Sequence, residues 1–436
     1  MKGRLNRLRF KVNLFADTTL SGQGSQWHIY GIPMLERQIR VFASLGAEKI
    51  TVIGPPGDEA IHKQLNQADV SWFKSVHPVA YHGANENPEP WRPSQNEAVL
   101  LIDAHQLFDQ RVLDALIARG PNTYVTDSKT NSVCHLAMVN GVLMNHMLQT
   151  WQDSASFWEA LEATTEETCQ PINIRGIDPY VVDLRRTIPT YWLPVNSEQD
   201  AARAEALLID AAQKGTLDFP ARYIHPPLEN RLTKWMSHTT ITPNHITTIT
   251  NIIAFFGVWL MATGTLFFGL ILAFVVGILD GVDGKLARVT VRCTKFGDRF
   301  EHILDNVYEL AWYWAIGWML SRGGVEMMPI VLSGVITLFY LLDRAATGLF
   351  KYRRGIELFD YAPIDRFFRL IGGRRNIYIL MLLAGVLGQR PAIGFQSVVV
   401  WAVITALFHW GRAIWLLLKQ PKQTEKSTAF SGETAT

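Results

Sequence analysis

Apolar and polar positions follow two different patterns along the chain. Up to residue 220, short apolar runs alternate with amphipathic segments. Three of these runs have the length and apolar character of buried strands: residues 11–17, 49–54 and 98–104. Between the first two, residues 34–46 repeat apolar positions at helical spacing, and a polar helix is expected near residues 198–214. Strand, helix and strand in this order predict a parallel sheet covered by helices, a Rossmann-like α/β domain at residues 1–220.

Long apolar stretches replace the short runs after residue 240. Ile246–Leu279 has no charged side chain and exceeds the roughly 20 apolar residues that one helix needs to cross a bilayer, so it predicts two spans. Six spans are predicted in all, at residues 246–262, 265–285, 299–320, 327–349, 375–389 and 393–418. We therefore expect a multidomain chain, in which the α/β domain precedes a six-helix transmembrane domain at residues 245–419. The basic segment 221–244 suits a helix on the membrane surface, and the polar tail 420–436 is expected to be disordered.

Charge refines this picture, because 48% apolar residues and a net charge of +2 would by themselves suggest a soluble protein. The connections on one side of the predicted spans hold most of the basic residues, among them Lys285, Arg288, Lys351, Arg353, Arg374 and Arg375. The other side has only Arg322 and Arg390. The positive-inside rule then predicts that both termini and the N-terminal domain face the cytoplasm, at the cell membrane. The basic start of the chain lacks an apolar run, so no signal peptide is expected.

Four carboxylates lie where the second and third predicted spans meet. Asp280 and Asp283 are three residues apart, and Glu301 and Asp305 are four apart, so each pair shares a helix face. Carboxylates near a membrane are costly and repel one another, and clustered carboxylate oxygens suit Mg²⁺ or Mn²⁺. Small residues between them leave room for a phosphate, and basic residues add positive charge beside it: Gly281, Gly284, Ala287 and Gly297, with Lys285 and Arg288. Ion pairing with nearby basic residues is the alternative, which would suit one acidic pair better than two.

The segment DGVDGKLARVTVRCTKFGDRFEHILD resembles the CDP-alcohol phosphotransferase signature, DxxDGxxAR, eight residues, then GxxxDxxxD. The matching positions are Asp280, Asp283, Gly284, Ala287, Arg288, Gly297 and Asp305. Glu301 departs from the pattern, because the family has its third aspartate there. TPNHIT, residues 242–247, resembles the TPNxxT that begins the family's first span. The resemblance extends over residues 222–418 and implies metal-dependent transfer of a phospho-alcohol from a CDP-alcohol to a hydroxyl acceptor, with release of CMP, in phospholipid or polar-headgroup biosynthesis.

The resemblance also implies roles for individual residues. Two ions, Mg²⁺ or Mn²⁺, would be held by the motif carboxylates Asp280, Asp283, Glu301 and Asp305, with Asp305 also taking the acceptor's proton. The CDP group would contact Asp280, Gly284, Ala287, Arg288 and Gly297. A basic cluster is interpreted either as a lipid-headgroup contact or as an anion pocket for a phosphorylated acceptor: Arg344, Lys351, Arg374 and Arg375. The resemblance implies a homodimer in the lipid bilayer, and no nucleic-acid partner is expected.

The N-terminal segment GIPMLERQIRVFASLGAEKITVIG resembles sugar-nucleotide transferases, and its fusion to the membrane domain resembles bifunctional inositol-phosphate cytidylyltransferase and di-inositol-phosphate phosphate synthases. Several groups that nucleotide transfer needs are replaced. The phosphate loop keeps Gly22 and Gly24 but has no Lys or Arg, and Ile32 stands where lysine is expected. The metal-aspartate positions are occupied by His105, Pro194 and Asn196. We therefore expect a nucleotidyltransferase-like domain without catalysis, with Asp103 as the one candidate replacement ligand.

Three other functions compete with an active transferase. A catalytically impaired membrane scaffold would explain Glu301 together with the replaced N-terminal residues, but the other motif positions are intact. A bifunctional enzyme would also make its own CDP-alcohol. A transporter would place its charges at the bilayer midplane within paired repeats, whereas these acids lie at a span end and no repeat is evident.

Overall fold

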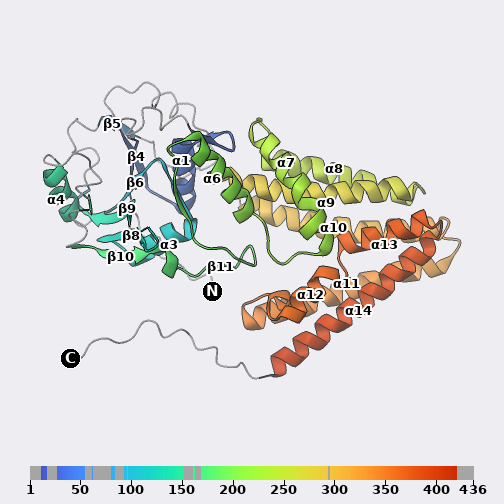
Figure 1. The fold of residues 1–436 in the computed structure, drawn as a ribbon. Helices are drawn as coiled ribbons and strands as arrows, with labels where there is room; N and C mark the ends of the chain where they lie inside the picture. Colours follow the sequence, from blue (N-terminus) through green and yellow to red (C-terminus); the bar gives the residue numbers. More distant parts are fainter. Residues whose placement is uncertain are drawn as a thin grey trace.

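The structure is a computed structural model with an N-terminal α/β domain and a C-terminal helical bundle (Figure 1). It describes residues 11–16, 27–54, 61, 80–83, 93–95, 97–130, 132–151, 161–162, 168–292 and 295–419. Within these, residues 80–83, 150–151 and 295–303 are described by their backbone only. The predicted tail at residues 420–436 and the loop glycines Gly22 and Gly24 lie outside the described residues.

A seven-stranded sheet forms the centre of the N-terminal domain, in the order β10-β8-β9-β6-β1-β4-β5. Its strands are β1 (Lys11–Phe15), β4 (Lys49–Gly54), β5 (Ala80–Gly83), β6 (Ala98–Asp103), β8 (Thr123–Asp127), β9 (Ser132–Asn140) and β10 (Gln170–Asn173). The three predicted strands are confirmed as β1, β4 and β6, and β1 pairs in parallel with the other two. The sheet is mixed rather than parallel, because β9 runs antiparallel to β6 and β8. Only a short turn separates β8 from β9, and a parallel pairing would need a crossover of a dozen or more residues.

Helices cover this sheet, and short strand pairs extend from it. The helices are α1 (Met34–Leu45), α3 (Gln110–Arg119), α4 (Gly141–Trp151) and α6 (Glu198–Ala211), so the two predicted helices are confirmed as α1 and α6. The short antiparallel pairs join β2 (His28–Ile29) to β3 (Ile32–Pro33), β7 (Gln106–Phe108) to β13 (Trp192–Pro194), and β11 (Tyr180–Val181) to β12 (Arg186–Thr187). α1 buries Leu35, Ile39 and Phe42 against the strands. It ends at Gly46, whose φ of 87° is a left-handed value that glycine adopts readily.

The C-terminal region is helical throughout most of its length. Its helices are α7 (His225–Ser237), α8 (Pro243–Ala262), α9 (Leu266–Val289), α10 (Lys295–Leu320), α11 (Met327–Arg354), α12 (Pro363–Ile371), α13 (Arg375–Leu387) and α14 (Pro391–Leu418). Within the described residues, four helices are long and apolar enough to cross a membrane, namely α8, α9, α11 and α14. The bent pair α12 and α13 gives a fifth span if it is counted as one. The 13 residues of α13 extend only about 20 Å, less than the roughly 30 Å hydrocarbon core, so the six predicted spans are not matched one to one.

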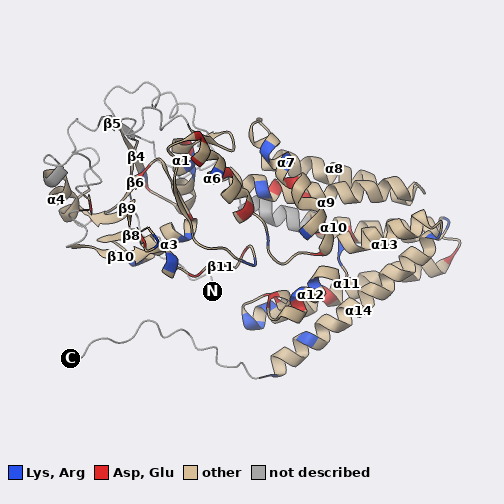
Figure 2. Ribbon diagram, viewed as in Figure 1, with Lys and Arg blue, Asp and Glu red and all other residues tan. Residues whose placement is uncertain are grey.

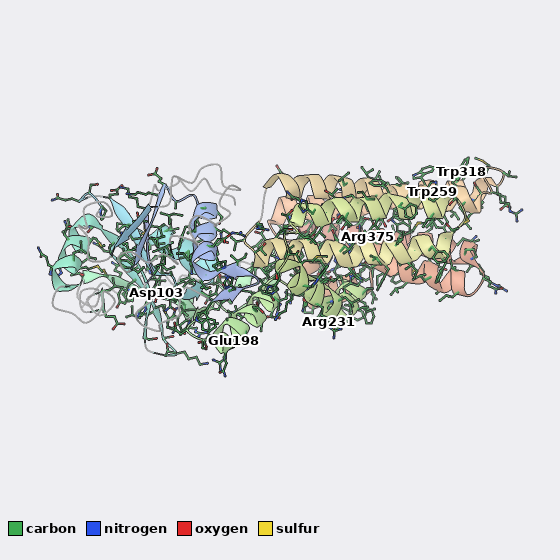
Figure 3. The ribbon with its side chains drawn as sticks, turned by 90° about the horizontal axis from the view of Figure 1, so that it is seen from above. Asp103, Glu198, Arg231, Trp259, Trp318 and Arg375 are labelled. Carbon is green, nitrogen blue, oxygen red and sulfur yellow. The ribbon has the colours of Figure 1, made fainter. Side chains whose placement is uncertain are left out.

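The charged residues of the bundle gather mostly at the end that faces the N-terminal domain (Figure 2). Trp259 and Trp318 lie at the opposite end, far from Asp103 in the sheet domain (Figure 3). α7 lies between the two regions and buries a stripe of polar residues, His225, Glu229 and Thr233, four positions apart along one face. The acidic motif therefore lies near the junction of the two regions, where α7 contacts α9.

Candidate active site

Asp283 is the most enclosed of the three motif carboxylates whose side chains are described. α8 begins after Thr242, whose hydroxyl accepts a hydrogen bond from the backbone of His245, and this start places Thr247 one turn into the helix. The Thr247 hydroxyl donates to Oδ2 of Asp283 at 2.8 Å. Asp283 is only 3% exposed, and among the described residues its Oδ1 has no hydrogen-bond partner. A buried carboxylate oxygen without a donor is costly, so this atom is suited to a cation ligand.

One guanidinium brings together carboxylates from two helices. Arg375, the first residue of α13, lies 3.5 Å from Oδ2 of Asp280 on α9 and 3.3 Å from Oδ1 of Asp305 on α10. Its Cζ lies 5.5 Å from the centre of the Tyr308 ring, and the arginine is placed inside the bundle in Figure 3. Because both acids contact the same side chain, Asp280 and Asp305 face a common space. Their side chains are 34% and 39% exposed, so this space is open, unlike the position of Asp283.

The other two α10 positions of the motif, Gly297 and Glu301, are described by their backbone only. α10 is continuous from Lys295, so Glu301 lies one turn before Asp305 and on the same helix face. No group of three or more His, Cys, Asp or Glu residues in metal-binding geometry occurs among the residues whose side chains are described, a set that excludes Glu301. Asp280, Asp283 and Asp305 are nonetheless carboxylates, the ligand type that hard divalent cations prefer, and Asp280 and Asp305 reach the same guanidinium.

Glu229 of α7 occupies the space beside Gly281. A Cβ at Gly281 would lie 2.2 Å from Oε1 of Glu229, so the predicted room for a phosphate is filled at this position. Oε2 of Glu229 lies 2.8 Å from Nζ of Lys285, which also donates to Asn230 at 2.6 Å. Lys285 is 2% exposed, so it is held against α7 rather than presented to the open space. Burial raises the pKa of the Glu229 carboxyl, while the ammonium of Lys285 acts to lower it.

The predicted CDP contacts on α9 lie just beyond these residues. Nε of Arg288 donates to the carbonyl of Ala212 at 3.0 Å. A Cβ at Gly284 would lie 3.2 Å from Nη1 of Arg288, so the absence of a side chain lets the guanidinium lie close along the helix. Ala287 is half-buried on the same turn. Arg288 therefore spans from the motif to the N-terminal domain.

Three of the four residues in the predicted basic cluster, Arg344, Arg374 and Arg375, lie near Tyr340 or Glu309, and Lys351 lies apart from them. Arg375 contacts the motif carboxylates, as described above, and its neighbour Arg374 is the residue that precedes α13. Arg344 on α11 donates to the Tyr340 hydroxyl at 3.1 Å and lies 3.8 Å from Glu309 on α10. Lys351 pairs with Glu357 at 2.7 Å. Arg344 and Arg375 thus approach α10 from different helices, whereas Lys351, in the last turn of α11, pairs with the segment that follows this helix.

Two contacts of the site were missed by sequence reasoning. TPNHIT was interpreted only as a helix start, although its final residue, Thr247, holds Asp283. Glu229 was placed on a membrane-surface helix, and its packing against Gly281 was not predicted. The signal was present in the spacing of His225, Glu229 and Thr233, because polar residues at positions i, i+4 and i+8 mark one face of a helix.

Asp103, the candidate replacement ligand in the N-terminal domain, has both oxygens engaged. Oδ1 accepts from the backbone of His105 at 2.9 Å and lies 3.0 Å from its Nδ1. Oδ2 accepts from the Gln106 side chain at 3.1 Å and lies 3.3 Å from Nδ1 of His135. Burial acts to raise the pKa of Asp103, but the hydrogen bonds from His105 and His135 outweigh it and hold that pKa well below its usual range. His105, where a metal aspartate was expected, is thus a donor to this carboxylate.

Carboxylates at one end of an apolar helical bundle define the C-terminal region as the catalytic type of membrane domain rather than a simple anchor. Residues 240–408 match the model of the family described as CDP-alcohol phosphatidyltransferase, and this part of the chain is a CDP-alcohol phosphatidyltransferase domain. Two curated relatives are named bifunctional IPC transferase and DIPP synthase. The Aquifex aeolicus protein is 28% identical over 221 residues, which cover 50% of this chain and 48% of the relative. The Archaeoglobus fulgidus protein is 27% identical over 162 residues, covering 36% and 33%. The chain thus spans about half the length, or less, of these relatives.

Solved structures similar to the chain fall into two groups. Phosphatidylinositol phosphate synthase from Mycobacterium tuberculosis with CDP-DAG bound is 16% identical, has a TM-score of 0.36, and covers 43% of this chain and 94% of its own. The 4-diphosphocytidyl-2C-methyl-D-erythritol synthase of Anaerococcus prevotii is 12% identical with a TM-score of 0.32, covering 48% of this chain and 99% of its own.

Proposed function

We propose that this protein transfers a phospho-alcohol from a CDP-alcohol to a hydroxyl acceptor and releases CMP. The observation that supports it most directly is the meeting of Asp280 and Asp305 at Arg375, beside the buried and under-coordinated Asp283. The CDP-alcohol phosphatidyltransferase domain at residues 240–408 points to the same chemistry. Buried carboxylate oxygens usually have a donor, so the Oδ1 of Asp283, which has none among the described residues, supports a ligand-binding role rather than a purely structural one.

In this proposal Asp305 is the general base. Its carboxylate is partly open to solvent, so an acceptor hydroxyl can reach it, and Arg375 fixes its orientation from one side. Asp305 takes the proton as the hydroxyl oxygen forms a bond to the β-phosphorus of the CDP-alcohol. The bond from that phosphorus to the bridging oxygen then breaks, and CMP leaves with the electron pair. Gly284, Ala287, Arg288 and Gly297 would contact the CDP group.

We infer that two divalent ions, Mg²⁺ or Mn²⁺, bind to Asp280, Asp283, Glu301 and Asp305. The under-coordinated Oδ1 of Asp283 supports this assignment, since a cation supplies what its hydrogen bonds do not. When bound, such ions stabilise negative charge on the attacking and leaving oxygens. The chain's own residues set the arrangement: Thr247 orients Asp283, and Arg375 spans Asp280 and Asp305.

Substrate and membrane placement follow from the charges around this site. Arg344 and Arg375 would bind an anionic acceptor or donor group, because both approach α10 and guanidinium groups recognise phosphate. We place the active site and both termini on the cytoplasmic side, in accordance with the basic connections, and we propose a homodimer in the bilayer.

The name of the curated relatives raises a second function, synthesis of the CDP-alcohol by the N-terminal domain. The described residues favour a non-catalytic domain instead. Asp103 has both carboxylate oxygens hydrogen-bonded, and Ile32 is buried at the position where a lysine is expected. A triphosphate would then meet neither that lysine nor a free acidic ligand, so leaving-group stabilisation would be lost.

Purified full-length protein tests both functions in one experiment. With Mg²⁺, a panel of CDP-alcohols and hydroxyl acceptors is scored for CMP release, and CTP with sugar or inositol phosphates is scored for pyrophosphate release. We expect CMP release from at least one pair and no pyrophosphate above background. Absence of CMP release across the panel would contradict the transferase proposal. Pyrophosphate release that disappears in Asp103→Ala would make the protein bifunctional.

A further inference from the structure

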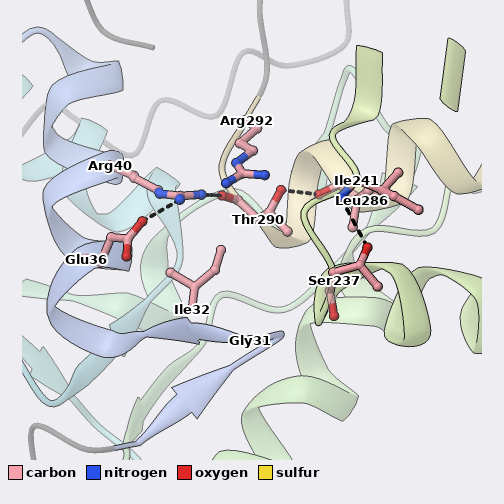
Figure 4. A pocket seen from close by; sticks show the side chains of 10 residues that line it. Gly31, Ile32, Glu36, Arg40, Ser237, Ile241, Leu286, Thr290 and Arg292 are labelled. Carbon is pink, nitrogen blue, oxygen red and sulfur yellow. Dashed lines mark hydrogen bonds and ion pairs between the residues drawn. The ribbon is translucent and has the colours of Figure 1, made fainter. Parts of the chain in front are cut away.

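Two buried arginines of the N-terminal domain bind the end of the helix that carries the acidic motif. Arg37 and Arg40 lie three positions apart on α1, on one helix face, and are 4% and 2% exposed. Nη1 of Arg37 donates to the carbonyl of Val289, and Nη1 of Arg40 donates to the carbonyl of Thr290 at 2.9 Å. Figure 4 shows Arg40 between Glu36, with which it forms an ion pair, and Thr290. Burial lowers the pKa of Arg37 to about 10, which leaves the group charged at neutral pH.

These contacts lie where a helix most needs outside partners. The last carbonyls of a helix have no intrahelical donor and form the negative end of its dipole, so arginine is favourable there. α9 ends at Val289, and Val291 shortly after it has a φ of 55°. A left-handed φ is unfavourable for a β-branched residue, and glycine usually occupies such positions. The turn itself is closed by the backbone N–H of Arg292, which donates to the carbonyl of Ala287 at 2.8 Å. Arg37 and Arg40 add donors to two later carbonyls, those of Val289 and Thr290.

The binding is reciprocal. Arg288 of α9 donates to the carbonyl of Ala212, the residue that ends α6 in the N-terminal domain. Each region thus supplies a guanidinium to a helix end of the other. A cavity of about 230 Å³ lies beside the Arg40 contact, and Ile32 lines it together with Arg40, Thr290 and Arg292 (Figure 4). This is less than the roughly 300 Å³ at which small-molecule pockets begin, so the space beside Arg40 is small for a ligand site.

The end of α9 that Arg37 and Arg40 contact lies close to the motif carboxylates. At 1.5 Å per residue, Asp283 lies only about 9 Å along α9 from Val289. We propose that the N-terminal domain serves as a positioning module, in which Arg37 and Arg40 set the end of α9 and thereby the placement of Asp280 and Asp283. The proposal rests on the proposed function of these carboxylates. It assigns a role to a domain that we propose to be non-catalytic. Loss of either guanidinium would leave a buried carbonyl unsatisfied and loosen the turn beside the motif.

The test uses full-length protein in lipid nanodiscs, with Mn²⁺ alone as the probe of the carboxylates. Mn²⁺ affinity is measured by electron paramagnetic resonance, and amide exchange is followed in the peptide that covers residues 286–292. We expect Arg37→Ala and Arg40→Ala each to weaken Mn²⁺ binding and lower kcat for CMP release by about 10- to 100-fold, the usual range for residues that orient metal ligands. Exchange in the peptide should accelerate, and Arg40→Lys should recover part of the loss. Arg203→Ala is the matched control, because Arg203 is 70% exposed on α6 and pairs only with nearby Asp200 among the recorded ion pairs of the described residues.

The outcomes separate this proposal from the proposed function. Faster exchange with unchanged Mn²⁺ affinity and CMP release would overturn the positioning role and leave only a structural contact. If Arg37→Ala does not assemble, the milder Arg40→Lys decides by the same two measurements. A third outcome is that Arg40→Ala weakens Mn²⁺ binding but wild-type protein releases no CMP from any donor. This result would contradict the transferase reaction and uphold the positioning role of the arginines.

Discussion

Two buried aspartates, one in each region, differ in how completely their oxygens are satisfied. Asp103 in the sheet domain is 6% exposed and has hydrogen-bond partners on both oxygens, from His105, Gln106 and His135. Asp283 in the bundle is 3% exposed, yet within the described residues only its Oδ2 has a donor, Thr247. Buried polar atoms are normally paired, so an exception calls for an explanation. The difference teaches that a carboxylate with complete hydrogen bonding is suited to a structural role, whereas one with an open oxygen is suited to bind a ligand.

The surroundings of the two aspartates extend the contrast. Asp103 is enclosed by side chains of its own domain, and its neighbours are neutral or imidazole groups. Asp283 lies beside Asp280 and Asp305, which are partly exposed and share Arg375. One region thus holds a closed, saturated carboxylate, and the other holds a carboxylate next to an open charged space.

The largest effect is expected from removing the divalent ions that Asp283 is proposed to bind. Excess chelator should reduce CMP release to background, and Mg²⁺ or Mn²⁺ should restore it, because charge on the reacting oxygens would otherwise be unopposed. Asp283→Asn should abolish Mn²⁺ binding, whereas Glu301→Asp keeps the charge and should stay within about tenfold of wild type, as expected for a retained ligand set. Full activity in chelator would refute the metal assignment. Loss of activity in Glu301→Asp would show that the longer side chain is required.

A smaller but still large loss of turnover is expected when the proposed general base, Asp305, is replaced. Asp305→Asn should lower kcat by about 10²- to 10⁴-fold, the range for removing a general base, while CDP-alcohol binding is largely kept. Turnover is followed as CMP release and donor affinity by equilibrium binding. Glu326→Gln, a substitution of a half-exposed acid in the loop before α11, is the matched control and should leave both unchanged. More than a few per cent of wild-type turnover in Asp305→Asn would require another base.

The smallest effect on catalysis is expected for Asp103, where stability changes instead. Asp103→Asn should reduce the free energy of unfolding by about 1–3 kcal/mol, because buried donors lose a charged acceptor, and should leave CMP release unchanged. The pKa of Asp103 is depressed in the folded state. Its carboxylate therefore contributes fully to stability above the unfolded pKa of about 3.9, and this contribution is lost progressively as the pH falls from there through the folded pKa. Thermal unfolding from pH 7 to pH 3 measures this, with exposed Asp183→Asn as control. Equal stability of Asp103→Asn and wild type at pH 7 would remove the contrast with Asp283.

Hydrophobic spacing was sufficient to predict much of the fold. The strands β1, β4 and β6 and the helices α1 and α6 follow from local patterns that a single segment contains. Strand direction does not, since the same apolar run suits either orientation, and the antiparallel β9 was missed. The six predicted spans are not confirmed one to one among the described residues, for a related reason. Apolar character continues through residues 375–389, but α13 ends at Leu387 and is too short to cross alone.

The candidate site shows the same limit. The spacing of Asp280 and Asp283, and that of Glu301 and Asp305, predicted that each pair shares one helix face, because helical periodicity is local. The positions of Glu229 and Arg375 depend on how α7 and α13 pack against α9, and no periodicity within one segment contains that information. Lys285 was accordingly assigned to the phosphate site, although it is buried against α7.

The contact between Gly281 and Glu229 also decides where a minimal version of the membrane domain must begin. The family match starts at residue 240, but a chain cut there would lack α7 and would remove both partners of the Lys285 ammonium. The cut would also expose apolar side chains of α9, including Val282 and Leu286, which pack against Leu232 and Met236 of α7, and it would empty the groove over Gly281. The folding unit therefore extends back at least to His225, so a truncation designed on the family boundary alone would divide one structural unit in two.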